Sequence, residues 1–335
     1  MLQSLPSSDS SAWFGSPLSK PVLIAGVALV LSVVAFLTVN AHLSADNWQF
    51  VLGLRGKKVV ALLIVGYAVG VSTLLFQTIT HNPILTPSLL GFDAIYVLIQ
   101  SVLVFVLGSV GFAGIPTLAK FGLEVGLLLG ASWALFALLF RRHHTDLVRL
   151  VLVGIIFGVL FRSLSSLISR LIDPDEFVTI QSASFAQFNT VDATLMWVSL
   201  GVCAVTAVLA WRWRHECDVL LLGRSQTLNL GVDYHRLTFR LLLMTSVLVA
   251  TATAFVGPVT FLGLLVCALT NRLSVGMAHG ERLILVSLLA MLCLVLGQTL
   301  FEQVLGMAGV LSVVIEFVGG VAFLLLVMSY RRGVV

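Results

Sequence analysis

The chain has few charged residues for its length. Of its 335 residues, 10% are Asp, Glu, Lys or Arg, and 59% belong to the hydrophobic set. Soluble domains are about 25% charged and about 45–50% apolar, because their surface has to carry polar groups. A mean hydropathy of +1.09 therefore excludes a cytosolic enzyme, a secreted disulfide scaffold and a disordered chain. We predict an all-α polytopic membrane protein.

The chain also lacks the motifs of common enzyme and metal sites. Its four cysteines form no C-x-x-C pair, which argues against a disulfide framework and a cysteine metal cluster. No G-x-x-x-x-G-K-[ST] phosphate loop, H-E-x-x-H zinc motif or G-x-S-x-G nucleophile elbow is present. We expect no catalytic residue, no metal ligand set and no cofactor in this chain. A basic tract with interleaved aromatics is also missing, so nucleic-acid binding is not expected.

Long apolar runs make up most of the chain. A bilayer crossing takes about 20 apolar residues, and we predict ten spans, at 21–39, 59–80, 89–111, 121–140, 147–172, 193–210, 237–256, 259–269, 283–300 and 310–330. The eighth is short and follows Gly257-Pro258, so this helix is expected to break or to cross only in part. A tail over 1–20, one transmembrane domain over 21–330 and a tail over 331–335 complete the predicted organisation.

Basic residues are distributed unevenly between the two sides of these spans. With the N-terminus in the cytoplasm, the cytoplasmic segments 141–149, 211–236, 271–282 and 331–335 contain eleven arginines. The opposite loops, 173–192 and 301–309, contain no Lys or Arg. This asymmetry predicts that both termini are cytoplasmic. Arg55, Lys57 and Lys58 break the pattern, either because the topology is wrong there or because they form an external basic patch.

Residues 76–91 depart most from plain apolar sequence. Pro83 and Pro87 cannot lie inside an uninterrupted helix, and Asn82, which precedes a proline, is disfavoured in helical conformation. Asn82 or Ser88 is available to cap the helix that follows. The segment is either a tight interhelical turn or a broken element at membrane depth. Broken backbone at that depth is tolerated only where it is buried or lines a cavity.

Three segments of the chain follow recognisable patterns. The first has Arg55-Gly56-Lys57-Lys58, an apolar helix, Gln77 and Asn82-Pro83-Ile84-Leu85-Thr86-Pro87-Ser88-Leu89-Leu90-Gly91, where the pattern is R-x-P-R, an apolar helix and Q-x-x-x-x-N-P-L-A-x-P-x-x-L-G. Residues 220–232 are similar to L-G-x-x-x-A-x-x-L-G-V, with Thr227 in place of alanine, and residues 257–264 are similar to G-x-I-x-F-V-G-L. With these segments the chain resembles the iron-siderophore and vitamin B12 permease subunits of binding-protein-dependent ABC importers.

The chain departs from the family pattern at two places. Cys267-Ala268 stands where a Pro-His pair is common, and residues 308–312 replace E-L-P-V-G. With these departures the chain resembles the branch whose two different permeases pair for catecholate-type siderophores such as petrobactin, anguibactin or vibriobactin. The resemblance implies a ferric siderophore as cargo, a second permease subunit, two ATP-binding subunits that carry ATP and Mg, a substrate-binding protein and a bacterial inner membrane. The alternatives are a permease for another chelated metal or cobalamin, and an ion-coupled secondary transporter.

Residues 211–236 are predicted to be cytoplasmic, yet they carry apolar side chains. Glycines at 223 and 231 are placed to end two short helices. Apolar groups presented to the cytosol mark a partner surface, and the alternative is a helix pair that lies on lipid headgroups. The resemblance implies that this segment couples the permease to its ATPase, through Leu220, Leu221, Leu222, Gly223, Leu230, Gly231 and Val232.

The resemblance also implies two further sets of functional residues. Arg55 and Lys58, at the R-x-P-R positions, are expected to pair with acidic groups of the binding protein; the alternative is anchoring at lipid headgroups. The pathway or structural motif comprises Gln77, Asn82, Pro83, Pro87, Gly91 and Glu316. Glu316 is ionisable inside a span, so we expect it to face a water-filled path or to pair with Arg162.

Overall fold

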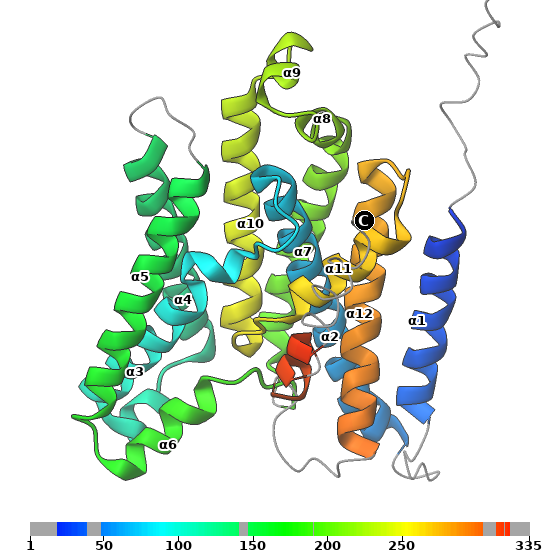
Figure 1. Cartoon of the computed structure of the whole chain (residues 1–335). Coiled ribbons are helices and arrows are strands. Elements are labelled where there is room, and N and C mark those ends of the chain that lie inside the picture. The colour runs from blue at the N-terminus through cyan, green and yellow to red at the C-terminus, as the bar shows by residue number, and fades with distance from the viewer. Residues whose placement is uncertain are drawn as a thin grey trace, which may run out of the picture.

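The computed structural model describes residues 19–38, 48–140, 147–189, 191–303, 313–317 and 319–321, and all regular structure within those ranges is helical (Figure 1). Nearly all of the predicted tail 1–20, most of the tenth span and the tail 331–335 lie outside the described residues.

Eight helices of the described ranges are long and apolar enough to cross a membrane. They are α1 (Lys20–Thr38), α2 (Trp48–Thr80), α3 (Phe92–Ala113), α4 (Thr117–Phe140), α5 (Leu147–Ser169), α7 (Ala193–Arg212), α10 (Tyr234–Val256) and α12 (His279–Gln303). Each overlaps one of the ten predicted runs, which confirms the all-α membrane class. The number of spans and the orientation of the termini stay predictions.

Shorter helices of the described ranges connect or flank these elements. Among them are η1 (Pro87–Leu90), α6 (Pro174–Ala183), α8 (Arg214–Leu220), α9 (Arg224–Asn229) and α11 (Leu262–Leu273), and residues 313–317 are also helical. At 12 residues, α11 is about 18 Å long, too short for a hydrocarbon core about 30 Å thick. The expectation of a partial crossing at this point agrees with the structure.

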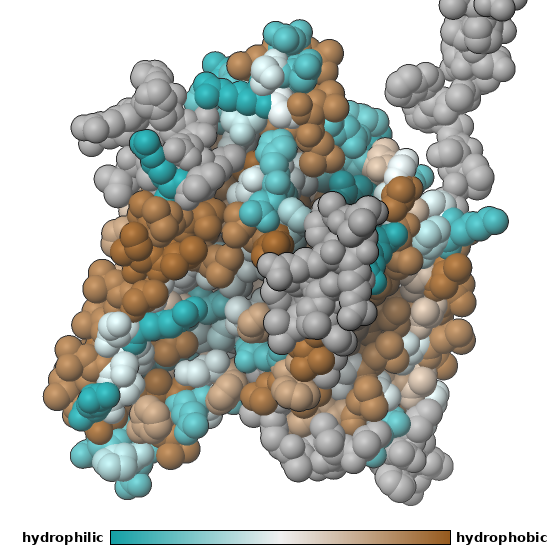
Figure 2. All heavy atoms as spheres, in the orientation of Figure 1, coloured by the Kyte–Doolittle hydropathy of each residue, from teal (hydrophilic) through white to brown (hydrophobic). Residues whose placement is uncertain are grey.

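Two helices form the centre of the molecule. Most of α2 and α10 is buried, whereas α1, α3, α4 and α5 bury only a small part of their apolar surface. In Figure 2 hydrophobic residues cover most of the flank formed by α3, α4 and α5, and hydrophilic residues gather near α6 and around α9. An apolar flank of this extent requires lipid or another subunit as its neighbour.

Glycines allow α2 to approach α12 closely. A Cβ at Gly66 would lie 2.8 Å from the backbone nitrogen of Met291, and one at Gly70 would lie 3.1 Å from the carbonyl oxygen of Val286. Small residues four apart permit this kind of backbone contact between membrane helices. The two glycines therefore serve helix packing.

The structure differs from the predicted spans at two places. Helix α2 has 33 residues and begins at Trp48, so Arg55, Lys57 and Lys58 lie within a helix rather than before one. Hydropathy placed the boundary too late because these bases interrupt the apolar run. Helix α6 occupies a predicted loop, with Pro174 at its N-terminus and acidic side chains in its first turn. These are favourable helix-start residues, but the segment is too polar to register as a span.

Candidate functional site

Two short helices form the tip of one end of the molecule, in the segment predicted to couple the permease to its ATPase (Figure 1). We call residues 214–232 the helix pair α8–α9. Gly223 follows α8 with a φ of 92°, and Gly231 follows α9 with a φ of 80°. Both angles lie in the region that favours glycine, and a Cβ at either glycine would meet open space. The prediction of two short helices is confirmed, and Gly231 directly follows the C-cap residue of α9. Gly223 does not cap α8, whose C-cap is Leu221, but occupies the N-cap position of α9.

Thr227 holds the two helices of the pair together. Its side chain is fully buried. The hydroxyl lies 3.1 Å from the carbonyl oxygen of Val219 in α8 and 2.8 Å from that of Gly223, and can donate to either. The alanine usual at this position has no group that could make these bonds. The departure from the family pattern therefore adds a polar contact between α8 and α9.

The predicted coupling residues divide into an exposed and a buried set. Leu222 is 60% exposed and Leu230 is 59% exposed, with Leu221 and Leu228 also on the surface. Leu220 is fully buried, and Val232 packs against the hydrophobic core. The exposed leucines form an apolar surface at the tip, while Leu220 and Val232 attach the pair to the protein.

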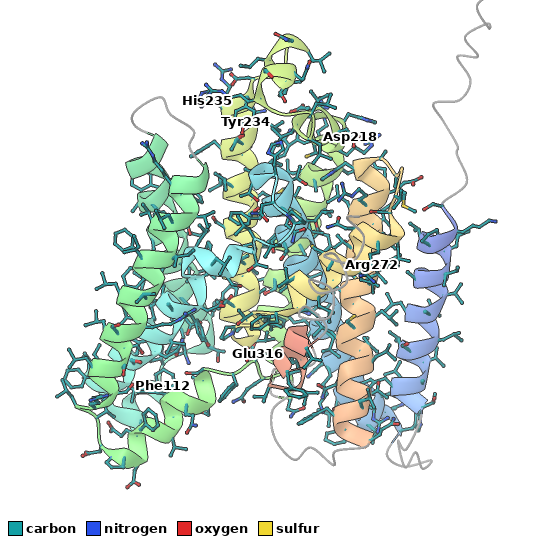
Figure 3. All side chains as sticks on the ribbon, viewed as in Figure 1. Phe112, Asp218, Tyr234, His235, Arg272 and Glu316 are labelled. Carbon is teal, nitrogen blue, oxygen red and sulfur yellow. The ribbon has the colours of Figure 1, made fainter. Side chains whose placement is uncertain are left out.

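A carboxylate anchors α8 to α12. Asp218 Oδ1 accepts a hydrogen bond from the backbone N–H of His279 at 2.7 Å, and Figure 3 shows Asp218 on α8 near the tip of the molecule. His279 begins α12, whose first N–H groups have no partner within the helix.

Next to Asp218 in α8, burial raises the pKa of the Cys217 thiol to about 12. This thiol stays protonated, and therefore poorly reactive, at neutral pH.

The segment between α2 and α3 makes its own polar contacts. Gln77 Nε2 donates to the carbonyl oxygen of Pro83 at 2.7 Å. Asn82 Oδ1 accepts from the N–H of Ile84 at 3.0 Å, an Asx turn. The sequence allowed Asn82 to cap the helix that follows, but Asn82 does not cap α3. Gly91, which has no side chain, occupies the N-cap position of α3.

The helix η1 packs directly on the backbone of α5. A Cβ at Gly154 would lie 2.9 Å from Leu90 Cα, and one at Gly91 would lie 3.1 Å from Gly158 Cα. Gly91 has a φ of 90°, a conformation that favours glycine. The turn from η1 into α3 therefore needs glycine both for this backbone angle and because a Cβ would crowd α5. Pro87 begins η1, and the pattern of prolines and glycine thus builds a short broken element between α2, α3 and α5.

Glu316 lies beside the start of α11 and α3. Thr260 Oγ1 is 3.4 Å from Glu316 Oε1 and 3.2 Å from Asp93 Oδ2, and Figure 3 shows Glu316 in the middle of the molecule. Arg162, the other partner considered from the sequence, is exposed on α5. A cavity of 20 Å³ lined by Asp93, Thr260 and other polar side chains adjoins this contact, which is room for about one water molecule.

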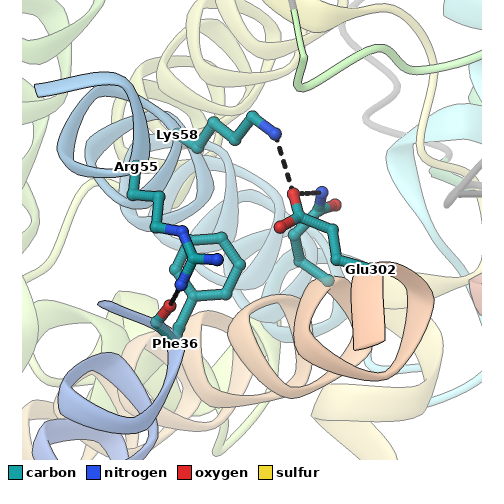
Figure 4. A network of polar contacts seen from close by, with 5 residues as sticks. Phe36, Arg55, Lys58 and Glu302 are labelled. Carbon is teal, nitrogen blue, oxygen red and sulfur yellow. Dashed lines mark hydrogen bonds and ion pairs between the residues drawn. The ribbon is translucent and has the colours of Figure 1, made fainter. Parts of the chain in front are cut away.

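The basic residues at the opposite end contact other helices. Arg55 Nη1 donates to the carbonyl oxygen of Phe36, at the end of α1, at 2.7 Å, and Lys58 Nζ pairs with Glu302 Oε1 at 2.8 Å (Figure 4). Lys57 is exposed. The three bases line an open cavity of 720 Å³ together with Asp192 and Glu302. Both Arg55 and Lys58 thus stabilise the fold at the rim of a depression.

A buried polar cluster in α3 and α4 is not among the predicted site residues. Glu124 is 2% exposed; it accepts from Gln100 Nε2 at 2.7 Å and lies 3.9 Å from Lys120 Nζ. It stands close to the start of the predicted span 121–140, where hydropathy alone lets a carboxylate reach water. The signal that could have found the pair is the spacing of Lys120 and Glu124 by four residues in an apolar helix, which puts both on one face.

Comparison with known proteins assigns the chain to a family. The FecCD transport family matches residues 21–329. The petrobactin import system permease protein YclO of Bacillus subtilis is 37% identical over 315 residues, which cover 93% of this chain and 98% of that protein. The petrobactin import system permease protein FatC of Bacillus anthracis is 30% identical, with 92% and 88% covered.

A solved structure, described as an inward-facing conformation of a metal-chelate type ABC transporter, superimposes with a TM-score of 0.81 at 20% identity and covers 92% of this chain and 98% of its own. At that identity the likeness shows the fold. The family match and the two relatives confirm the resemblance carried by residues 77–91, 220–232 and 257–264. The chain belongs to the FecCD transport family.

Proposed function

We propose that this chain is the membrane-spanning permease subunit of an ABC importer for a ferric siderophore. The observation that carries the proposal is the helix pair α8–α9, which presents four exposed leucines at a polar end of a membrane protein. Such a surface is typical of a partner contact, and the family assignment makes an ATPase the partner. The chain is not itself an enzyme; ATP and Mg would bind to the separate ATPase subunits.

The relatives identify the chemical class of the cargo. Two of the similar proteins are named as petrobactin import permeases, so we propose ferric petrobactin or a related iron chelate. Iron would travel inside its chelator, which removes the need for metal ligands in the permease. Other relatives are named for hemin and vitamin B12 import at lower identity, and these cargoes remain the alternatives.

The proposed complex has several further components. A second permease chain, related to this one but different, would complete the path through the membrane of a bacterium. The weakly buried flank of α3, α4 and α5 leaves apolar surface for such a neighbour. Two ATPases would bind inside, and a substrate-binding protein would deliver cargo outside. The pathway motif of Gln77, Asn82, Pro83, Pro87, Gly91 and Glu316 would then lie where a helix is interrupted within the membrane domain.

Docking of the binding protein is proposed for the opposite end from the helix pair. The cavity of 720 Å³ there is lined by Arg55, Lys57 and Lys58, so an acidic side chain of a partner has both space and positive charge to meet. Lys58 is paired with Glu302, and a docking carboxylate would share or displace that contact. Charges at such a rim mainly accelerate association and orient the partner.

Cargo identity is tested by uptake in cells that lack this chain. We expect deletion to abolish import of radiolabelled ferric petrobactin, and a plasmid copy to restore it, with ferric enterobactin, hemin and cobalamin measured in parallel. Normal import of ferric petrobactin by the deletion strain would refute the siderophore assignment, and loss of hemin or cobalamin import alone would assign that cargo instead.

The ATPase contact is tested by charge in the apolar surface. We expect the double variant Leu222→Glu and Leu230→Glu to weaken capture of the ATPase in detergent by roughly thirtyfold, the effect of losing about 2 kcal/mol at buried interface positions. Val275→Glu is the matched control, because Val275 is an exposed apolar residue in the nearby α11–α12 connection. Unchanged ATPase capture by the double variant would show that the helix pair lies against lipid or another surface.

Binding-protein docking is tested by neutralising the bases. We expect Arg55→Gln and Lys58→Gln to slow association of the binding protein by roughly tenfold at low salt, with the difference vanishing in high salt as charges are screened. Glu302→Gln is the control, because it removes the same ion pair as Lys58→Gln and keeps both bases. If Glu302→Gln slows association as much as Lys58→Gln does, the bases serve the fold and not the partner.

A further inference from the structure

A single imidazole joins the helix pair α8–α9 to the interrupted segment between α2 and η1. His81 Nε2 lies 2.9 Å from the carbonyl oxygen of Leu220, and His81 Nδ1 lies 3.1 Å from that of Ile79. Leu220 is the last residue of α8, and Ile79 belongs to the last turn of α2. The two ring nitrogens thus face carbonyl oxygens at the C-terminal ends of two helices, and a neutral imidazole donates to one of them. His81 and Leu220 are 139 residues apart in the chain.

The backbone of His81 has an unfavourable conformation that this contact accounts for. Its φ of 50° makes it the one residue other than glycine with a positive φ in the described part of the chain. A side chain with a Cβ rarely adopts this conformation, and such strain persists where the surrounding structure imposes it. Here the conformation ends α2 and directs the imidazole toward α8. In the tautomer that carries its proton on Nε2, the ring donates to Leu220.

The segment that follows His81 is stiff. Asn82 accepts a hydrogen bond from the Ile84 N–H, Gln77 holds the carbonyl group of Pro83, and the two prolines fix their own φ angles. The segment ends in η1, where Leu90 and Gly91 lie against the backbone of α5. Because little in this stretch can rotate freely, a displacement of His81 would be passed on to η1 and, through it, to α5.

A second polar contact connects the helix pair α8–α9 to another helix of the membrane domain. Asp218 ties α8 to the N-terminus of α12, so the helix pair has polar contacts with two other parts of the membrane domain. Helix α12 packs closely on the buried helix α2, whereas α5 buries little of its surface within the chain. His81 itself follows the end of α2, and residues 82–91 lead from it to α5, a helix that packs less tightly and can move with less loss of contact.

We propose that His81 is a positioning residue that transmits movement of the helix pair α8–α9 to η1 and α5. The inference rests on the proposed binding of an ATPase to that pair and adds to it a route into the membrane domain. Loss of the imidazole should uncouple ATP hydrolysis from transport. The ATPase should still bind and hydrolyse ATP, but less cargo should be imported for each ATP hydrolysed. A side chain that only stabilised the fold would lower hydrolysis and transport together.

The test uses His81→Gly in the complete complex of permeases, ATPases and binding protein in proteoliposomes, with radiolabelled ferric petrobactin as the probe. Glycine accepts the positive φ without strain, so the variant keeps the backbone and removes the imidazole that faces Leu220. We expect unchanged ATPase capture, an ATP hydrolysis rate at least equal to wild type, and a ratio of cargo imported to ATP hydrolysed that falls by about fivefold or more.

Two further variants make the result specific. His81→Gln keeps an N–H donor at the end of its side chain and should restore most of the import ratio. His235→Ala removes a histidine at the start of α10, on the same side of the molecule, and should leave the ratio unchanged. An unchanged ratio in His81→Gly, or loss of ATPase capture by it, overturns the transmission role. Failure of the wild-type chain to capture the ATPase would instead refute the proposed function itself.

Discussion

In a bilayer, every backbone N–H and C=O group must find a partner within the protein, and the rest of this structure depends on how that requirement is met where helices break. Three interruptions show it. Gln77 satisfies the carbonyl group of Pro83, Glu176 Oε1 accepts the N–H of Ser109 beside a kink at Gly108, and the carbonyl oxygen of Val256 accepts from Gln187. In each case a partner outside the regular helical bonding restores the lost bond.

These interruptions are also where helices are tied to distant parts of the chain. The break after α2 brings His81 to α8 and η1 to α5, and the break before α11 brings Thr260 to Asp93 and Glu316. The uninterrupted helices mainly supply apolar surface. A transporter that has to change the arrangement of its helices needs connections of this kind, because they can transmit a shift while the helices that they join stay intact.

Much of the fold followed from hydropathy, because eight runs of apolar sequence coincide with eight long helices. The short helices α8 and α9 were predicted from two glycines that flank apolar residues. Helix α6 and the early start of α2 were not predicted, since hydropathy detects lipid contact and these residues are polar. For the site, sequence spacing identified the segments but not their partners. Nothing local to Lys58 indicates Glu302, and nothing local to His81 indicates Leu220, because those contacts depend on how distant helices pack.

The central claim is that the exposed leucines of the helix pair α8–α9 are the surface on which an ATPase acts. Cross-linking of Leu222→Cys to the ATPase by a bifunctional maleimide tests it most directly. Cys203, Cys217 and Cys267 are buried, and the thiol of Cys217 has its pKa raised by burial to about 12, so the native thiols near the pair will react poorly. The account predicts a cross-link from position 222 and none from Val275→Cys. A cross-link from position 275 with none from 222 would contradict it.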